Sequence, residues 1–122
     1  MKSITPLLYV EDLIESLAFY QVLGFEIEQR MPEDEEPTWV YLVSGGVHLM
    51  LQQTEEKLAS IRMEREIEQD MVLHLGHSDI VEFYGMLVEE GIAVSEISDT
   101  DLPEFTMQDP DGYTLVFFLD EG

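Results

Sequence analysis

The side chains best able to bind a metal ion or move a proton near neutral pH are three histidines, His48, His74 and His77. His48 and His74 fall in apolar segments typical of strands, whereas His77 precedes a helical pattern. Two imidazoles on neighbouring strands could share a divalent cation, but no Asp or Glu falls at the complementary strand positions. We therefore favour neutral histidines hydrogen-bonded within or at the rim of a pocket. A shifted two-histidine metal site remains the alternative.

Aromatic side chains recur on the segments expected to be strands. Trp39 and Tyr41 alternate along one segment and should share a face of the sheet, because side chains two positions apart in a strand point the same way. Trp39 suits a ligand contact or a core position equally well. The predicted ligand-binding residues are Trp39, Tyr41, His48, Met50, His74, Phe105, Tyr113 and Phe118. Core positions are expected instead for Phe19, Phe83 and Phe117.

No other pattern indicates catalysis. The sequence has no Gly-rich phosphate loop, its serines lie outside any nucleophile-elbow motif, and it contains no cysteine. Carboxylates are so abundant that a pair at any chosen spacing can be found by chance. We therefore predict no catalytic residue, no metal ligand set and no cofactor.

The charge balance excludes several partners. The chain carries 27 Asp and Glu against 5 Lys and Arg, a formal net charge of −22. Nucleic acids and anionic membrane surfaces both require a basic patch, so neither is an expected partner. An acidic field could attract a cationic ligand, although an acidic surface kept for solubility or salt tolerance explains most of these carboxylates.

Length and hydropathy predict one globular domain. The chain has 122 residues, of which 45% are hydrophobic, which suits one compact domain with one core. No apolar run approaches the roughly 18 to 20 residues that span a bilayer. The N-terminus leads directly into a strand pattern and lacks the segments of a signal peptide. These features predict a cytoplasmic protein.

The sequence repeats itself at an offset of 67 positions. Residues 12–15 (Asp-Leu-Ile-Glu) then align with 79–82 (Asp-Ile-Val-Glu), and 24–27 (Gly-Phe-Glu-Ile) align with 91–94 (Gly-Ile-Ala-Val). Such self-similarity indicates two copies of one supersecondary unit, each too small to bury its own apolar face. The copies should therefore pack against each other or against a partner chain.

The first copy is expected to form a β-α-β-β-β unit. Asp12 should cap its helix, with Glu15 as the reciprocal partner, and Gly24 should end the helix in a left-handed conformation. Strands are predicted at 4–10, 25–29, 38–43 and 47–52, the last two joined by a turn at Gly45-Gly46.

The second copy repeats this order. Its predicted elements are a strand at 71–76, a helix from Asp79 to about Glu90, a strand at 92–97 and a hairpin over 105–119 that turns at 109–112. Module one is thus predicted at 1–53 and module two at 71–122. The charged segment 54–70 is a linker in this interpretation, and the domain is 1–122.

Several stretches in this order give the chain a family resemblance: Val10-Glu11-Asp12-Leu13, Leu23-Gly24-Phe25, Val47-His48-Leu49-Met50-Leu51-Gln52 and Asp109-Pro110-Asp111-Gly112-Tyr113. The chain resembles the vicinal oxygen chelate superfamily, which includes glyoxalases, bleomycin resistance proteins and extradiol dioxygenases. The resemblance implies an α+β fold of two tandem β-α-β-β-β modules whose strands curl into a cup, commonly completed by a second subunit. It does not specify a function, because this scaffold hosts both enzymes and binding proteins.

The resemblance also identifies four positions where metal-using members place His or Glu. Three of them are Thr5, Val72 and Val116 here, and the fourth falls on either His48 or Leu49. Threonine and valine offer no imidazole or carboxylate to a divalent cation. In this respect the chain looks closest to the metal-free bleomycin-resistance type.

Together, the residues and the resemblance predict a protein that binds and sequesters a small organic molecule, with antibiotic resistance through a cationic ligand as one option. The alternative is a metal-dependent lyase or dioxygenase with an irregular site built from His48, His74 and a carboxylate. A third class is an interaction module whose cup receives another chain. A homodimer is expected, because the cup would otherwise expose a large apolar patch. Swapped and side-by-side arrangements both remain open.

Overall fold

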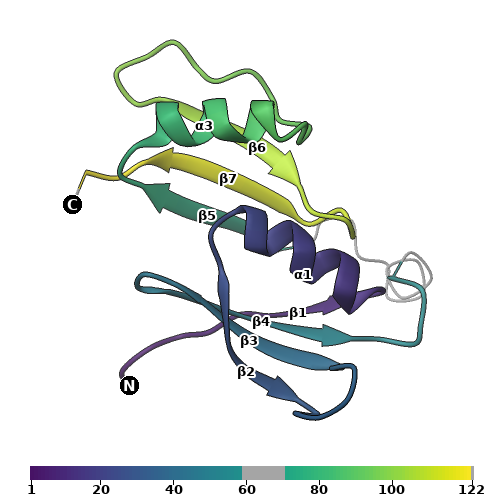
Figure 1. Cartoon of the computed structure of the whole chain (residues 1–122). Helices are drawn as coiled ribbons and strands as arrows, with labels where there is room; N and C mark the ends of the chain where they lie inside the picture. Colours follow the sequence, from purple (N-terminus) through teal and green to yellow (C-terminus); the bar gives the residue numbers. More distant parts are fainter. Residues whose placement is uncertain (59–70, 122) are drawn as a thin grey trace. The chain divides into compact units, whose positions relative to one another are not determined.

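The computed structural model describes residues 1–58 and 71–121 (Figure 1). The chain divides into two compact units, Met1–Glu68 and Gln69–Gly122. Among the described residues, each unit pairs one small β-sheet with one helix, so the predicted α+β class is confirmed. Positions 59–70 of the predicted linker lie outside the described residues. Within the described part of the chain, no helix is long and apolar enough to cross a membrane.

Unit 1 has the predicted β-α-β-β-β order. Its elements are β1 (Leu7–Val10), α1 (Leu13–Val22), β2 (Glu26–Met31), β3 (Trp39–Ser44) and β4 (Val47–Gln53). The four strands form one sheet in the order β1-β4-β3-β2 (sheet 1), in which β1 runs parallel to β4 and the other pairs are antiparallel. β1 begins later than predicted. Pro6 accepts a hydrogen bond from the Met50 N–H but has no N–H of its own to extend the ladder.

Alternation along the strands assigns one face of sheet 1 to the core. In Figure 1, α1 crosses this face of the sheet. The side chains buried there are Leu8, Val10, Val40, Leu42, Leu49 and Leu51 from the strands, with Leu13 and Tyr20 from α1. The opposite face keeps the remaining, alternating residues of each strand.

Both helices end in the same hydrogen-bonded cap. At the end of α1, Gly24 has a φ of +108° and its N–H donates to the Gln21 carbonyl, while the Phe25 N–H donates to the Tyr20 carbonyl. The Tyr20 and Phe25 rings meet edge to face at 5.9 Å. Two such backbone bonds with an apolar contact define a Schellman motif. The predicted left-handed glycine is therefore confirmed.

The two helices begin differently although both have aspartate at the N-cap. The Asp12 carboxylate accepts a hydrogen bond from the Glu15 N–H at 3.2 Å, as the capping box predicts. Asp79, in contrast, makes no side-chain cap bond, and its own N–H donates to His77 Nδ1 at 3.0 Å. The Asp79 side chain instead hydrogen-bonds the Glu82 carboxyl.

The contact between Asp79 and Glu82 predicts that Glu82→Gln changes the melting temperature by an amount that depends on pH. The hydrogen bond with Asp79, and then repulsion from the Asp79 charge, raise the pKa of Glu82. Protonated Glu82 therefore stabilises the folded state more than ionised Glu82 does. This stabilisation is lost as the pH rises through the raised pKa of Glu82. Glutamine keeps a hydrogen-bond donor at every pH. The variant should melt above the wild type at pH 7, with the difference vanishing near about pH 3. An equal difference at both pH values, measured by thermal melting, would contradict this assignment.

Unit 2 lacks one predicted strand. Its elements are β5 (Val72–His77), α3 (Ile80–Glu89), β6 (Glu104–Gln108) and β7 (Thr114–Leu119), with the sheet order β5-β7-β6 (sheet 2). The hairpin turn at 109–112 is as predicted, with the Asp109 carboxylate accepting hydrogen bonds from two N–H groups of the turn. The prediction of a strand at 92–97 is wrong, because this segment forms only a single β-bridge, between Val94 and Met107.

Serine side chains explain the missing strand. The hydroxyl of Ser95 accepts the Thr106 N–H at 2.8 Å, and that of Ser98 accepts the Glu104 N–H at 2.9 Å. The backbone N–H groups of both serines donate back to the carbonyls of the same β6 residues. Serine hydroxyls compete with backbone carbonyls for N–H donors, so the segment follows β6 without forming a regular ladder.

Candidate functional site

Four of the predicted ligand-binding residues lie on one surface, the face of sheet 1 opposite α1, which we call the open face of sheet 1. The strand register aligns its side chains in three rows: Tyr9, Gln52, Trp39 and Met31; Leu7, Met50, Tyr41 and Gln29; and His48, Val43 and Glu26. Trp39, Tyr41, His48 and Met50 therefore share this face. The shared face predicted for Trp39 and Tyr41 is confirmed.

The centre of this face is aromatic. The rings of Trp39 and Tyr41 lie 6.4 Å apart at a tilt of 60°, and the Tyr41 and His48 rings meet edge to face at 5.7 Å. All three side chains are half-buried. At the margins, Tyr9 is 53% exposed and Met31 is 60% exposed. The result is a continuous aromatic and thioether surface that a flat organic molecule could cover.

A short chain of hydrogen bonds supplies polarity to this surface. The Tyr41 hydroxyl lies 2.9 Å from His48 Nδ1 and 3.4 Å from the Thr5 hydroxyl. When His48 is neutral with its proton on Nε2, Tyr41 donates to Nδ1 and its oxygen keeps a lone pair that can accept from another donor. Thr5 was not among the predicted site residues. Its position as a metal-ligand equivalent was the sequence signal that could have found it.

The structure resolves which residue fills the fourth family metal position in unit 1. His48 lies on the open face of sheet 1, whereas Leu49 is 2% exposed and lies on the side covered by α1. In unit 2, Val72 and Val116 lie on the face of sheet 2 opposite α3, in register with Thr114 and His74 respectively. One imidazole with threonine and two valines does not fit a divalent metal site. Within residues 1–58 and 71–121, no three or more His, Cys, Asp or Glu side chains gather as a metal site would require.

This misfit predicts the response to added metal. Zn²⁺ or Ni²⁺ should leave the melting temperature unchanged, because only an ion that prefers the native state would raise it. His48→Ala should behave as the wild type in the same experiment. A melting temperature that rises with one equivalent of metal, and no longer rises in His48→Ala or His74→Ala, would establish the two-histidine site.

Two further predicted residues lie on the corresponding face of sheet 2. His74 is exposed and stands in register with Val116, while Phe118 is half-buried beside Gly76. His77 points to the other side. It stacks on Phe83 at 4.4 Å and accepts the Asp79 N–H, so its role is to connect β5 to the start of α3.

The last two predicted ligand-binding residues, Phe105 and Tyr113, are buried. Phe105 is only 1% exposed and packs between α3 and sheet 2, 5.0 Å from the Tyr84 ring and 5.3 Å from that of Phe117. It pairs with Phe117 across the hairpin, which puts both rings on the same side of the sheet. Tyr113 is buried in the turn, where its N–H donates to the Asp109 carboxylate. Neither side chain lies on the open face of sheet 1.

One concave surface in unit 1 was not anticipated from the sequence. It is a hollow of about 420 Å³ beside β2, which we call the β2 hollow, lined by Ile27, Glu28, Gln29, Arg30, Met31 and Glu33. β2 is an edge strand of sheet 1, and its pairing with β3 is irregular between Ile27 and Gln29.

Comparisons with known proteins agree on one family. The model of the Glyoxalase/Bleomycin resistance protein/Dioxygenase superfamily matches residues 3–117. Among solved structures, a bleomycin-binding protein complexed with bleomycin is similar at a TM-score of 0.72 and 22% identity, covering 99% of this chain and 100% of that one. No curated protein sequence matches the chain.

Two other similar solved structures are an antibiotic-binding protein and an enzyme. The antibiotic-binding protein TnmS3 from Streptomyces sp. CB03234 has a TM-score of 0.67 and 20% identity, covering 96% of this chain and 95% of that one. Lactoylglutathione lyase from Agrobacterium tumefaciens has a TM-score of 0.71 and 19% identity, covering 99% of this chain and 96% of that one. At these identities the likeness concerns the fold.

Proposed function

This chain belongs to the glyoxalase/bleomycin resistance protein/dioxygenase superfamily, and from that premise we propose that it binds and sequesters a small organic molecule on the open face of sheet 1. The observation that carries the proposal is the half-buried cluster of Trp39, Tyr41 and His48, in which two rings adjoin a hydrogen-bonded hydroxyl–imidazole pair. Binding sites for small molecules combine apolar walls with a few fixed polar groups in this way.

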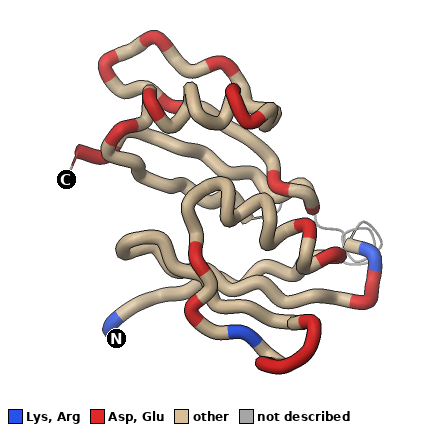
Figure 2. The backbone as a smooth tube through the Cα atoms, viewed as in Figure 1, with Lys and Arg blue, Asp and Glu red and all other residues tan. Residues whose placement is uncertain are grey.

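Charge favours a cationic and partly planar ligand. The net charge is −22, and Figure 2 shows acidic residues along loops and helix ends of both units. Such a field attracts cations over long distances. At short range, a cation over the face of Trp39 or Tyr41 gains about 0.5 to 2 kcal/mol, more as water is removed. Similarity to bleomycin-binding and antibiotic-binding proteins supports an antibiotic as one ligand of this kind.

The proposal includes a cytoplasmic homodimer, as expected from the sequence. Its support is the apolar content of the open face of sheet 1, where Leu7, Val43 and Met50 accompany the aromatic rings. Apolar area on this face that the ligand leaves uncovered would gain roughly 25 cal/mol per Å² on burial against a second copy. Native mass spectrometry of protein from its own host should report a dimer and any retained small molecule together. A monomer at micromolar concentration would remove the dimer from the proposal.

A metal-dependent lyase or dioxygenase is the second candidate, because His48 occupies the one family ligand position in unit 1 that could bind a metal.

Trp39 is the only tryptophan, so its fluorescence reports on the proposed site directly. Titration with bleomycin and with smaller aromatic cations should change this fluorescence without added metal. A response that requires a divalent metal would favour the second candidate. No response to any cation, with a positive response to neutral compounds, would remove the cationic preference.

A further inference from the structure

The hydroxyl of Tyr41 is the polar centre of the open face of sheet 1. It lies 2.9 Å from His48 Nδ1 and 3.4 Å from the Thr5 hydroxyl, and both contacts are only partly buried. The Tyr41 ring lies beside the rings of Trp39 and His48. A flat ligand that covers these rings therefore also meets the hydroxyl group.

The contact with His48 determines what the Tyr41 hydroxyl offers to a ligand. When the proton of neutral His48 is on Nε2, Nδ1 accepts the Tyr41 hydrogen, and the Tyr41 oxygen keeps a lone pair for a donor on the ligand. A positively charged donor on this oxygen polarises the hydroxyl and strengthens its bond to Nδ1, because hydrogen bonds in a chain reinforce one another. A cationic donor thus selects the tautomer in which Tyr41 is an acceptor.

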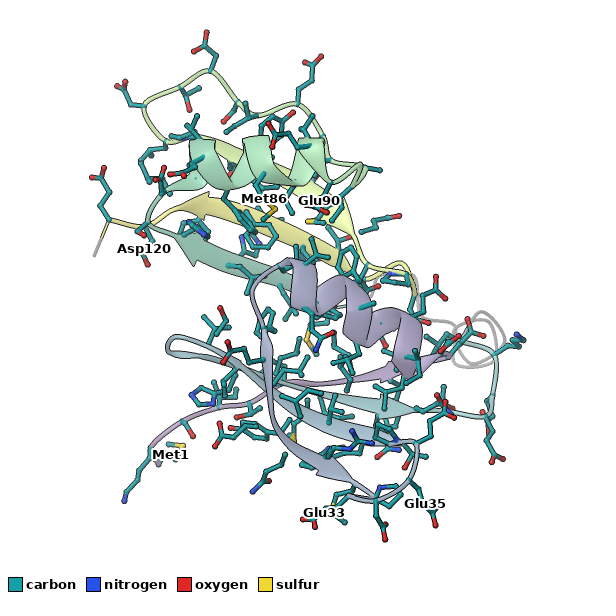
Figure 3. The ribbon with its side chains drawn as sticks, viewed as in Figure 1. Met1, Glu33, Glu35, Met86, Glu90 and Asp120 are labelled. Carbon is teal, nitrogen blue, oxygen red and sulfur yellow. The ribbon has the colours of Figure 1, made fainter. Side chains whose placement is uncertain are left out.

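One carboxylate shares the open face with this hydroxyl–imidazole pair. Among the three rows of described residues it is Glu26, which is exposed and stands in register with Val43 and, one strand further, with His48. Glu33 and Glu35 belong instead to the loop that follows β2, from which their side chains project (Figure 3). Water and salt screen such exposed charges. The carboxylates therefore attract a cation to the face, while the groups at the rings determine how it is held.

The Tyr41 oxygen distinguishes between kinds of cation. Any cation over an aromatic ring gains the cation–π attraction, but only an ammonium with N–H groups can also donate a charge-assisted hydrogen bond. We propose that the open face of sheet 1 recognises a protonated primary or secondary amine attached to a flat ring. An N–H group of the ammonium donates to the Tyr41 oxygen, while His48 accepts the Tyr41 hydrogen. This inference rests on the function proposed for this face and specifies its class of ligand.

Three probes with the same naphthalene ring test the proposal: 1-naphthylmethylamine, its N,N,N-trimethylammonium analogue and the neutral 1-naphthylmethanol. Calorimetric titrations use the full-length protein at about pH 8, where an alkylamine is protonated. The amine should bind at least about tenfold more tightly than either analogue, because the trimethylammonium has no N–H group and the alcohol has no charge. Equal affinities for the amine and the trimethylammonium, or no binding of the amine, would overturn the proposal.

Tyr41→Phe removes the acceptor and keeps the ring. This variant should bind the amine at least about tenfold more weakly than the wild type does, and should bind the trimethylammonium with unchanged affinity. Glu26→Gln removes the carboxylate of the same face and should change the affinity for the amine by less than about threefold, since its charge is exposed. Melting curves confirm that each variant is folded. A loss of amine binding in Glu26→Gln but not in Tyr41→Phe would assign recognition to the carboxylate and refute the proposal.

Two substitutions of His48 test its role as a positioning residue. His48→Gln should keep the preference for the amine over the trimethylammonium, because the glutamine carbonyl can accept the Tyr41 hydrogen, whereas His48→Phe should lose most of it. An unchanged preference in His48→Phe would contradict this role. Trp39→Ala should weaken all three probes. If it does so while the amine and the trimethylammonium bind equally, this inference fails and the proposed function stands. If it weakens none of them, both fail.

Discussion

Trp39→Ala is expected to weaken binding at the open face of sheet 1 by about 2 kcal/mol, which is close to thirtyfold in the dissociation constant. The indole ring is half-buried and lies 6.4 Å from Tyr41 in the middle of the face. Its removal deletes the largest apolar contact available to a flat ligand and any cation–π contribution. Calorimetric titration with bleomycin, or with a molecule retained in native mass spectrometry, measures the loss without relying on the missing fluorophore.

Graded and distant variants control this experiment. Trp39→Phe keeps a ring and should lose less affinity than Trp39→Ala. Leu102→Ala removes an apolar side chain that is 77% exposed in unit 2, and it should have no effect. If Trp39→Ala binds with wild-type affinity, the ligand does not lie on the open face of sheet 1, and the proposed function loses its site.

Replacing Gly24 or Gly91 by valine should destabilise the protein by about 1–2 kcal/mol each, because β-branched residues are strained at positive φ. The two glycines have φ values of +108° and +77° at the ends of α1 and α3. Space is not the cause, since a Cβ at Gly24 would meet only Ser44 Oγ at an ordinary 3.6 Å and one at Gly91 would meet nothing within 4 Å. Each melting temperature should fall by several degrees, at about 3–6 °C per kcal/mol for a chain of this size.

Gly46 provides the matched control for these two glycines. Its φ lies outside the left-handed region, and a Cβ there would also meet nothing within 4 Å. Gly46→Ala should therefore change the free energy of unfolding by less than about 0.5 kcal/mol. If both valine variants have the same melting temperature as the wild type, the Schellman caps do not contribute to stability as their geometry indicates.

Local signals in the sequence were sufficient to predict most of the fold. The offset of 67 positions placed Gly24 and Gly91 at equivalent helix ends, and both have the positive φ that the alignment required. The turns at Gly45-Gly46 and at 109–112 were recognisable from their residue types alone. These features depend on neighbours close in the sequence, which a single chain reveals.

Features that depend on a partner distant in the sequence were missed. The segment 92–97 has an apolar alternation typical of a strand, but its outcome was decided by the hydroxyls of Ser95 and Ser98 meeting N–H groups of β6. The burial of Phe105 against α3 was not predicted, because the pairing register of the hairpin, not the composition of the strand, sets which side faces α3.

In the candidate site, too, features set by the local sequence were predicted and features set by distant residues were not. Alternation correctly placed Trp39 and Tyr41 on one face, while ligand contact by these residues stays a prediction. The β2 hollow could not be found from the sequence, because Arg30 is a single cation between acidic residues with no motif around it. Only the folded structure shows that Arg30 donates to the Glu35 carbonyl and that its Nε atom is buried.

The serine contacts along β6 have a consequence for self-association. β6 is an edge strand, and exposed strand edges attract strands of other molecules into intermolecular sheets and aggregates. At Glu104 and Thr106 the outward N–H groups are already bonded to serine hydroxyls, and the carbonyls accept the serine N–H groups. A foreign strand would have to displace these bonds before it could dock. Ser95→Ala combined with Ser98→Ala would therefore open this edge and make the protein more prone to aggregate through unit 2.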